Sequence, residues 1–483
     1  MTILALSVAN DNREDYAVVL DELRAALRRA VDVKVEAGAS FAEREAALLE
    51  VANEASRLNL RAELQAIADR QLEMMLIDGV LFQRHQDGGA SYHSLCGPLP
   101  VRRATYRKVG ERNGSTVVPL ELAAGLIEGA TPALAYRVAL GYAQGPGRHA
   151  EEQIRADHRV PPSRSTLERM AKAIGAHVKA AAPRIEPLLR HEEKLPEGAH
   201  AISTGLDRTS VPMEEVRPQG ERPTTRRKKR TKPYVRKAPP PVDVRYRMAY
   251  VGTVSVVDKD GKALITRRYA ISGAEEPTQI VGRMMADVRR AREQDPRLPV
   301  GLLQDGAPEM WALMRQGLKT QAEVPRWCEG IDRYHLNERL AEVLRIAEPD
   351  EGRRRQQLAQ WNDKLDSDDG AIDGIGRWLA DRIPWHRGED LEKLEAHWTF
   401  LLNNNDRMRY VTLRRCGLPC GSGATEGACK SVVMIRAKGC GQRWHEDGVG
   451  AALTLRATYM SERLSTLWRH FATEYSADVR AAA

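Results

Sequence analysis

Apolar residues recur at alternate positions along the stretch from Val244 to Asp258, and this pattern limits the segment to an extended strand with one buried face. The turn Lys259-Asp-Gly261 then leads into a second extended stretch, Ala263 to Ile271. A glycine-containing turn between two such stretches predicts a β-hairpin. The side chains that we expect on one side of the first strand are Val244, Tyr246, Met248, Tyr250, Val254 and Val256.

Further strand and helix signals surround this hairpin. Before it, the segment from His200 to Asp207 alternates in the same way, and we expect that strand to end at Asp207. The elements expected after it are a helix from Pro277 to Arg292, a strand from Leu298 to Leu303 that runs into Asp305, a helix from Pro308 to Leu318 and a strand from Glu323 to Gly330. This order predicts an α/β domain with a mixed sheet.

The part of the chain before this domain is predicted to be mainly helical. From about Asp15 to Arg84 the apolar residues, among them Leu72, Met75 and Leu76, recur at helical spacing. Residues 88–119 contain Gly, Pro and short β-prone pieces, which predicts a small β ribbon. We therefore expect a helical region at 1–87, the ribbon at 88–119 and a second helical domain at 120–195.

The last helix of the 120–195 domain is a candidate for reading DNA. It opens at Ser163, a favourable N-cap, and carries Arg164 and Arg169 near its start. The recognition helix of a helix-turn-helix presents its N-terminal residues to base edges in this manner. A plain helical bundle with a basic edge is the alternative, and we favour the helix-turn-helix.

A helical segment divides the rest of the chain. The first part of the α/β domain is expected at 196–335 and includes a basic loop at 214–241. Residues 336–415 have a helical pattern and are expected to form an all-α insertion, whose tryptophans are Trp361, Trp378, Trp385 and Trp398. The final part, 416–483, is expected to return to the α/β domain through a helix, a Gly-rich basic turn and another helix.

The balance of charge favours a polyanionic partner. Lys and Arg total 74 against 66 for Asp and Glu, which gives a net charge of +8. The segment from Arg222 to Lys237 holds nine Lys or Arg among sixteen residues, so it cannot fold alone, and we expect it to contact phosphates. No apolar run reaches the length of a membrane span, and six dispersed cysteines indicate reduced thiols, so a cytoplasmic protein is expected.

Three carboxylates stand at the ends of predicted elements beside glycines or turns. Asp207 and Asp305 follow predicted strands, and Glu426 begins a predicted helix after Gly421-Ser-Gly423. Transfer of a phosphoryl group in DNA requires cations to be placed against the scissile phosphate, and carboxylate oxygens from different elements are the ligands that Mg²⁺ prefers. Asp207, Asp305 and Glu426 are therefore candidate metal ligands, although surface carboxylates and helix caps are common alternatives.

Four sequence blocks stand in order along the chain: Thr204-Gly-Leu-Asp207, Leu303-Gln-Asp305-Gly-Ala-Pro-Glu-Met-Trp311, Ile331-Asp-Arg-Tyr-His335 and Gly421-Ser-Gly-Ala-Thr-Glu426-Gly-Ala-Cys-Lys430. Together these blocks resemble bacterial insertion-sequence transposases of the Kra type (ISKra). The basic segment from Arg436 to Trp444 also looks like that family, and the likeness extends over about Tyr92 to Trp468. The ordered set is far more specific than any single block.

This resemblance implies an RNase H-like catalytic domain with an Asp-Asp-Glu triad, interrupted by the helical insertion. Asp207, Asp305 and Glu426 would be the triad, with Asp207 bridging two Mg²⁺ ions per active site and Mn²⁺ able to replace Mg²⁺. Asp332 and His335 match an Asp-x-x-His element of related transposases, and either active-site support or a structural role is expected for them.

The expected activity is metal-dependent strand cleavage and strand transfer at the ends of an insertion sequence in bacteria. The partners would be double-stranded DNA, both terminal inverted repeats and target, and further copies of the chain in a dimer or larger oligomer. Residues expected to contact DNA are Arg164, Arg169, Arg226, Arg227, Lys228, Lys229, Arg230, Lys430, Arg436, Lys438 and Arg443. The alternatives are a domesticated DNA-binding protein without catalysis and a host nuclease of RNase H type.

Overall fold

The computed structural model describes residues 21, 24, 25, 28, 40–111, 114–217 and 241–482. The chain forms two compact units: Glu186–Arg463, and Met1–Ile185 together with Leu464–Ala483. The unit Glu186–Arg463 contains a mixed sheet with helices on it, and the other unit contains an antiparallel sheet with helices. In the described part of the chain, no helix combines the length and the apolar character needed to cross a bilayer.

The unit Glu186–Arg463 is built around a five-stranded sheet in the order β7-β6-β5-β8-β9. β5, β6 and β7 pair antiparallel, whereas β8 lies parallel to β5, and β9 lies parallel to β8. The strands are β5 (Ala201–Val216), β6 (Val242–Val257), β7 (Ala263–Ile271), β8 (Val300–Gln304) and β9 (Cys328–Ile331). The predicted hairpin and the mixed sheet are confirmed.

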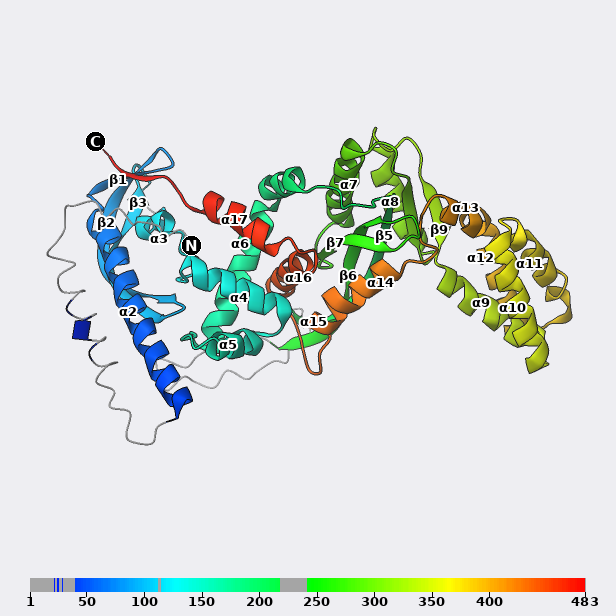
Figure 1. Ribbon diagram of the computed structural model, residues 1–483, viewed down its shortest axis with the longest axis horizontal. Coiled ribbons are helices and arrows are strands. Elements are labelled where there is room, and N and C mark those ends of the chain that lie inside the picture. Colours follow the sequence, from blue (N-terminus) through cyan, green and yellow to red (C-terminus); the bar gives the residue numbers. More distant parts are fainter. Residues whose placement is uncertain are drawn as a thin grey trace. The chain divides into compact units, whose positions relative to one another are not determined.

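Helices cover both faces of this sheet (Figure 1). α7 (Pro277–Gln294) packs on one face, where a Cβ at Gly252 of β6 would meet Met284. α14 (Gly423–Ala428) packs on the other face, where a Cβ at Gly205 of β5 would meet Thr425. Because neighbouring residues of a strand point to opposite faces, Gly205 and Asp207 share the face that α14 covers.

Two predicted features of β5 and β6 were wrong. β5 does not end at Asp207 but continues to Val216, because its backbone pairs with β6 from Ala201↔Val257 to Val216↔Val242. The first part of β6 is exposed. Val244, Tyr246 and Met248 therefore do not belong to the core, although their alternation suggested a buried face. Residues 214–216 of the basic loop predicted at 214–241 belong to β5 instead, and residues 218–240 lie outside the described part.

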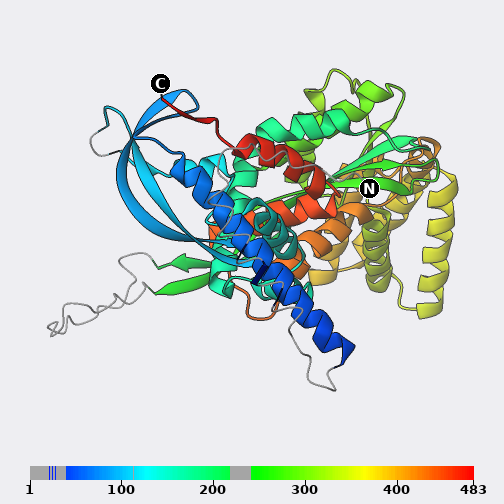
Figure 2. The ribbon, with the colours of Figure 1, turned by 60° about the vertical axis from the view of Figure 1, so that its left-hand side comes forward.

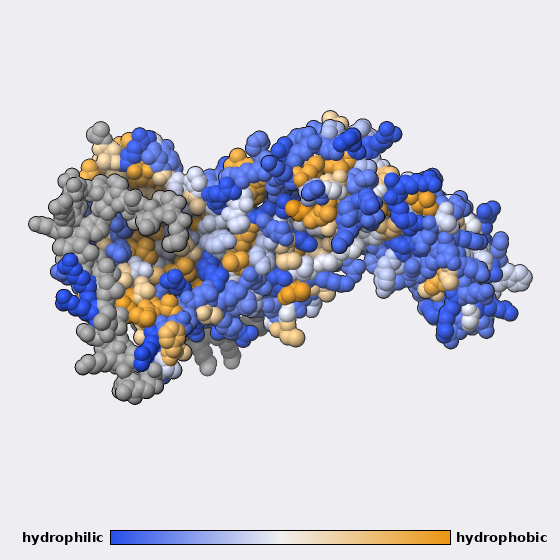
Figure 3. Space-filling view, in the orientation of Figure 1, coloured by the Kyte–Doolittle hydropathy of each residue, from blue (hydrophilic) through white to orange (hydrophobic). Residues whose placement is uncertain are grey.

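The insertion is helical, as predicted, and lies beyond β9 in Figure 1. Its elements are α9 (Arg333–Ala347), α10 (Glu351–Ser367), α11 (Ala371–Ala380), α12 (Gly388–Asn404) and α13 (Tyr410–Arg415), with 3₁₀ turns at Ile383–Trp385 and Asn405–Arg407, whereas α8 (Pro308–Lys319) lies between β8 and β9. Trp361 is buried and packs edge-to-face against Trp378 with 4.9 Å between ring centroids. The outer surface of α9–α12 is largely hydrophilic (Figure 3), as expected for a bundle whose apolar residues point inward.

After the insertion the chain returns to the sheet and then leaves it. α14 runs into a π-helical segment (Cys429–Met434) and a short α15 (Ile435–Ala437), and α16 (Glu446–Met460) follows. The predicted C-terminal part of the α/β domain, 416–483, differs from the observed one, because α17 (Leu464–Tyr475) and β10 (Val479–Ala481) belong to the other unit.

The unit Met1–Ile185 with Leu464–Ala483 has an antiparallel sheet in the order β10-β1-β2-β3-β4. Its strands are β1 (Met74–Ile77), β2 (Val80–Ser94), β3 (Gly97–Lys108), β4 (Thr116–Val117) and β10. Figure 2 shows β2 and β3 as a long bent ribbon alongside α2 (Phe41–Asp69). The prediction of helix as far as Arg84 was wrong, because Met75 and Ile77 alternate inward from β1 between β10 and β2.

Helices α3 (Pro119–Ala123), α4 (Pro132–Gln144), α5 (Gly147–Ala156) and α6 (Arg164–Glu192) complete this unit, and the unit boundary falls within α6. α4 and α5 pack closely, since a Cβ at Gly141 would lie within 2.7 Å of Ala150 Cβ. The helix expected to open at Ser163 begins at Arg164 and continues to Glu192.

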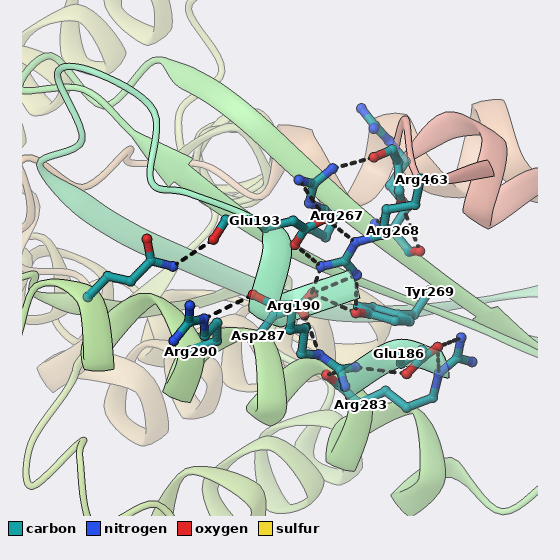
Figure 4. Close-up of polar contacts among 12 residues, drawn as sticks. Glu186, Arg190, Glu193, Arg267, Arg268, Tyr269, Arg283, Asp287, Arg290 and Arg463 are labelled. Carbon is teal, nitrogen blue, oxygen red and sulfur yellow. Dashed lines mark hydrogen bonds and ion pairs between the residues drawn. The ribbon is translucent and has the colours of Figure 1, made fainter. Parts of the chain in front are cut away.

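A buried ionic network joins the end of α6 to the sheet and to α7 (Figure 4). Asp287 of α7 accepts hydrogen bonds from Arg190 Nε at 2.7 Å and from Arg463 Nη2 at 2.9 Å, and Tyr269 donates its hydroxyl to the same carboxylate. Arg463 also pairs with Glu193 at 2.6 Å. Although burial opposes ionisation, the two arginines hold the pKa of Asp287 below its ordinary value, so the carboxylate remains charged.

Candidate active site

Asp207 lies within β5, and Asp305 lies directly after the end of the neighbouring parallel strand β8. β5 and β8 pair with a constant offset of 98 residues, as in Ile202↔Val300 and Thr204↔Leu302. The same offset separates Asp207 from Asp305 (305 minus 207 is 98), which follows directly after β8. Continued register would therefore set the two carboxylates opposite one another on the face that α14 covers.

The surroundings of Asp207 disfavour its charged form. Burial raises the pKa of the Asp207 carboxyl, and the negative charge of Asp305 raises it further. Two hydrogen bonds oppose this shift: the Arg208 backbone N–H donates to Oδ1 at 2.6 Å, and the Cys429 thiol donates to Oδ2 at 3.3 Å. The positive charge that His335 can carry also lowers it. A pair of carboxylates in this setting is suited to bind a cation, which would relieve their repulsion.

Glu426 approaches the same face through the seating of α14 on the sheet. Thr425 is buried, and its hydroxyl lies 2.7 Å from the Thr253 hydroxyl of β6. Gly205, which pairs with Thr253, leaves the space that the Thr425 side chain fills. Glu426 and Cys429 are three residues apart on one helical segment and so share a side of it. The contact of Cys429 with Asp207 therefore directs the same side of the segment toward the two aspartates.

The carboxylate of Glu426 pairs with Lys430 Nζ at 2.7 Å, one helical turn further on. Within residues 40–111, 114–217 and 241–482, no group of three or more His, Cys, Asp or Glu side chains is arranged to hold a metal ion. For Glu426 to act as a third ligand, its side chain would have to turn away from Lys430. The ion pair between Glu426 and Lys430 is exposed and therefore weak, so this rotation costs little.

Asp332 and His335 lie at the start of α9, where β9 ends. Asp332 is the N-cap of α9 and accepts hydrogen bonds from the Tyr334 and His335 backbone N–H groups at 2.7 and 3.0 Å. Its other oxygen accepts from Ser422, immediately before α14. Although burial opposes ionisation, these hydrogen bonds lower the pKa of Asp332. The His335 ring is partly exposed, and its Nδ1 lies 3.2 Å from Glu338.

The basic residues around this site differ in accessibility. Lys430 and Arg443 are exposed, and Arg443 lies 3.8 Å from Glu214 of β5. Lys438 Nζ donates to Thr209 Oγ1 at 2.7 Å, two residues along β5 from Asp207. Arg436 is not at the surface as the DNA-binding prediction required. Its side chain is 2% exposed and stacks over the Trp444 ring at 4.9 Å, because this segment folds onto β5.

The remaining predicted DNA contacts lie elsewhere. Arg164 and Arg169 are exposed at the start of α6, where they pair with Glu151 and Glu128 at 3.6 Å. Arg226, Arg227, Lys228, Lys229 and Arg230 lie outside the described residues.

Sequence reasoning missed three residues that position the site: Gly205, Thr425 and Cys429. Gly205 and Thr425 belong to quoted blocks, but only the tertiary contact shows that one makes room for the other. Cys429 belongs to the last quoted block, but the sequence pattern assigned it no contact with the carboxylates. Its spacing of three residues from Glu426 was the available signal.

No protein-family model and no curated protein sequence matches this chain. Among solved structures, the Drosophila P element transposase strand transfer complex aligns with a TM-score of 0.26 and 10% sequence identity. The alignment covers 71% of this chain and 80% of that chain. A likeness of this size defines neither the fold nor the activity of the chain.

Proposed function

We propose that this chain is a DNA transposase of the insertion-sequence type, and that the unit Glu186–Arg463 is its RNase H-like catalytic domain. The observation that carries the proposal is the offset of 98 residues shared by the β5–β8 pairing and the pair Asp207 and Asp305. A shared offset supports two carboxylates at the same level on one face of the mixed sheet, and the helix that carries Glu426 packs on that face. The sequence blocks that resemble Kra-type transposases contain these three residues.

The carboxylates of the candidate site are ligands of the kind that Mg²⁺ and Mn²⁺ prefer. Asp207, Asp305 and Glu426 offer hard oxygen ligands from three separate elements, and Asp207 and Asp305 repel one another without a cation. Two bound ions would supply an activated water or 3′-hydroxyl and would stabilise the leaving oxygen. The chain itself then provides the positions of the ligands and a partly buried setting in which their charge acts strongly.

Basic side chains beside the carboxylates are suited to hold a DNA backbone. Lys430, Lys438 and Arg443 lie on the segment that follows Glu426, and charge-assisted hydrogen bonds from them would orient the scissile strand. In the other unit, Arg164 and Arg169 on α6 would contact the terminal repeats, as in a helix-turn-helix. Assembly of two ends requires at least a dimer in this proposal.

The proposal is tested with a supercoiled plasmid that carries the DNA flanking this coding sequence on both sides. Asp207→Asn, Asp305→Asn and Glu426→Gln should each abolish nicking and joining in Mg²⁺ while binding to the same DNA in a gel-shift assay is retained. Glu293→Gln, an exposed carboxylate on α7, is the matched control and should cleave like the wild type. Full cleavage by Asp207→Asn would refute catalysis by this site, and binding without cleavage by the wild type would favour a DNA-binding protein.

A further inference from the structure

Asp332 connects the segment that ends in Asp305 with the segment that carries Glu426. Its backbone N–H donates to the carbonyl of Gln304 at 2.9 Å, and Gln304 is the residue before Asp305. Its side-chain oxygen Oδ2 accepts hydrogen bonds from the Ser422 backbone N–H and, at 2.8 Å, from the Ser422 hydroxyl. One buried residue thus contacts the end of β8 and the turn that begins α14.

Both oxygens of the Asp332 carboxylate accept hydrogen bonds from donors within the protein. Oδ1 is occupied by two backbone N–H groups of α9 and Oδ2 by Ser422, and the side chain belongs to a residue only 4% exposed. Gly421 allows this approach, since a Cβ there would lie 3.2 Å from Oδ2. A carboxylate with both oxygens engaged in this way is a poor candidate for a metal ligand and a good one for a structural tie.

The hydrogen bonds between Asp332 and Ser422 are important because the insertion separates these two residues in the sequence. Ser422 lies 90 residues after Asp332, and all of α9 to α13 is placed between them. The entropy of closing a connection grows with its length, so the start of α14 would be poorly fixed without contacts at the base of the insertion. The Arg333 backbone N–H, which donates to the Cys420 carbonyl at 3.0 Å, closes the same base.

We propose that Asp332 is a positioning residue of the active site, which sets the place of Glu426 relative to Asp305 by tying the turn at Ser422 to the end of β8. This inference rests on the proposed function. Asp332 binds no metal ion in it and touches no reacting atom. It acts through Ser422 and α14, and its ionised form is the one that accepts from all four donors.

The test compares Asp332→Asn and Ser422→Ala with a matched control, Asp369→Asn. An asparagine at 332 can still cap α9 through its oxygen, but it presents an amide N–H₂ group to the Ser422 N–H. Asp369 binds the start of α13 in the same manner, through the Val411 and Thr412 N–H groups and the Thr412 hydroxyl, and among the described residues its hydrogen bonds reach none of the segments that carry Asp207, Asp305 or Glu426. Each full-length variant is assayed for plasmid cleavage, for Mn²⁺ binding by electron paramagnetic resonance and for its melting temperature.

Misplacement of a catalytic group by about 1 Å can reduce the rate on the order of 100-fold. We therefore expect Asp332→Asn to lose cleavage on that scale and to bind Mn²⁺ more weakly, with a smaller effect of the same kind for Ser422→Ala. Asp369→Asn should lower the melting temperature and leave Mn²⁺ affinity unchanged. Ser422→Ala keeps the proposal testable if Asp332→Asn does not fold, because it removes one hydroxyl only.

The outcomes separate this inference from the proposed function. If Asp207→Asn cleaves normally, the proposed function fails. If Asp207→Asn is inactive but Asp332→Asn and Ser422→Ala cleave and bind Mn²⁺ like the wild type, positioning by Asp332 is refuted alone. Complete loss of Mn²⁺ binding in Asp332→Asn, with Ser422→Ala unaffected, would make Asp332 a ligand and would also overturn the inference.

Discussion

Replacing Gly205 by alanine should displace α14, the helix that carries Glu426, from the sheet. A Cβ at this position would overlap Thr425 Oγ1 and would lie 2.9 Å from the carbonyl oxygen of Leu303. Thr425 cannot simply rotate away without losing its bond to the Thr253 hydroxyl, and the Leu303 oxygen is backbone of β8. The substitution therefore forces α14, β5 and β8 apart at the point where the candidate ligands converge.

The size of the effect follows from these two overlaps. Overpacking a well-packed core costs about 1–3 kcal/mol, and the backbone contact places Gly205→Ala at the upper end, near 3 kcal/mol. At roughly 2–4 °C per kcal/mol for a domain of this size class, the unit should melt about 6–12 °C lower. Thermal unfolding in EDTA, followed by circular dichroism, measures this shift, and plasmid cleavage in Mg²⁺ measures the loss of function.

The control is Gly282→Ala on α7, where an added Cβ meets nothing within 4 Å. It should be neutral or stabilising by up to about 1 kcal/mol, because alanine is the better helix former. Adding Thr425→Ala to Gly205→Ala removes one of the two overlaps and should recover part of the lost stability, a coupling that a double-mutant cycle detects. Equal melting temperatures for Gly205→Ala and the wild type would show that α14 does not rest on Gly205.

Three further outcomes are expected. Burial raises the pKa of Asp207, so the stability associated with its protonated form is lost as pH rises through that pKa; Asp207→Asn, which cannot ionise, should melt above the wild type at neutral pH in EDTA. Asp287→Asn removes the buried negative charge that Arg190 and Arg463 share and should cost about 3–5 kcal/mol in urea unfolding, against less than ~0.5 kcal/mol for Glu293→Gln. Because the pKa of Asp287 is lowered, its contribution should vanish as pH falls through that value in an acid titration. Trp361→Ala should cost about 3–5 kcal/mol and Trp385→Ala almost nothing, since only the former is buried, and thermal unfolding compares them.

The order of elements in the α/β unit could be predicted because local signals agree with the tertiary fold there. The hairpin of β6 and β7 combines alternation with a Gly turn, and β8 is a short apolar run that ends directly before Asp305. Asp305 is exposed because it follows directly after the last residue of β8, and the end of that apolar run is visible in the sequence. Helices α7 and α8 begin with proline, at the position where their predicted starts were set.

Features that depend on distant contacts could not be predicted in this way. Beyond Asp207, β5 contains Pro212 and several polar residues, which read locally as the end of a strand. Pairing with β6 on one side and with Trp444 on the other keeps it extended. Likewise, Arg436 lies among basic residues in the sequence, but packing against Trp444 buries it, and no local pattern distinguishes it from Lys438.

The placement of Glu426 depends on contacts along the whole of its helical segment, and this leads to a last prediction. Ser422 is tied to Asp332 before the helix, Thr425 is seated beside Gly205, and Cys429 touches Asp207 after it. If Gly205→Ala and Asp332→Asn both act by moving α14, the second substitution should weaken Mn²⁺ binding less in a background where the first has already displaced the helix. Residues in a shared network are expected to be non-additive by about 0.5–3 kcal/mol, whereas independent sites add within about 0.5 kcal/mol. Strict additivity of the two effects on Mn²⁺ affinity would mean that the tie at Asp332 and the seat at Gly205 do not control the same ligand.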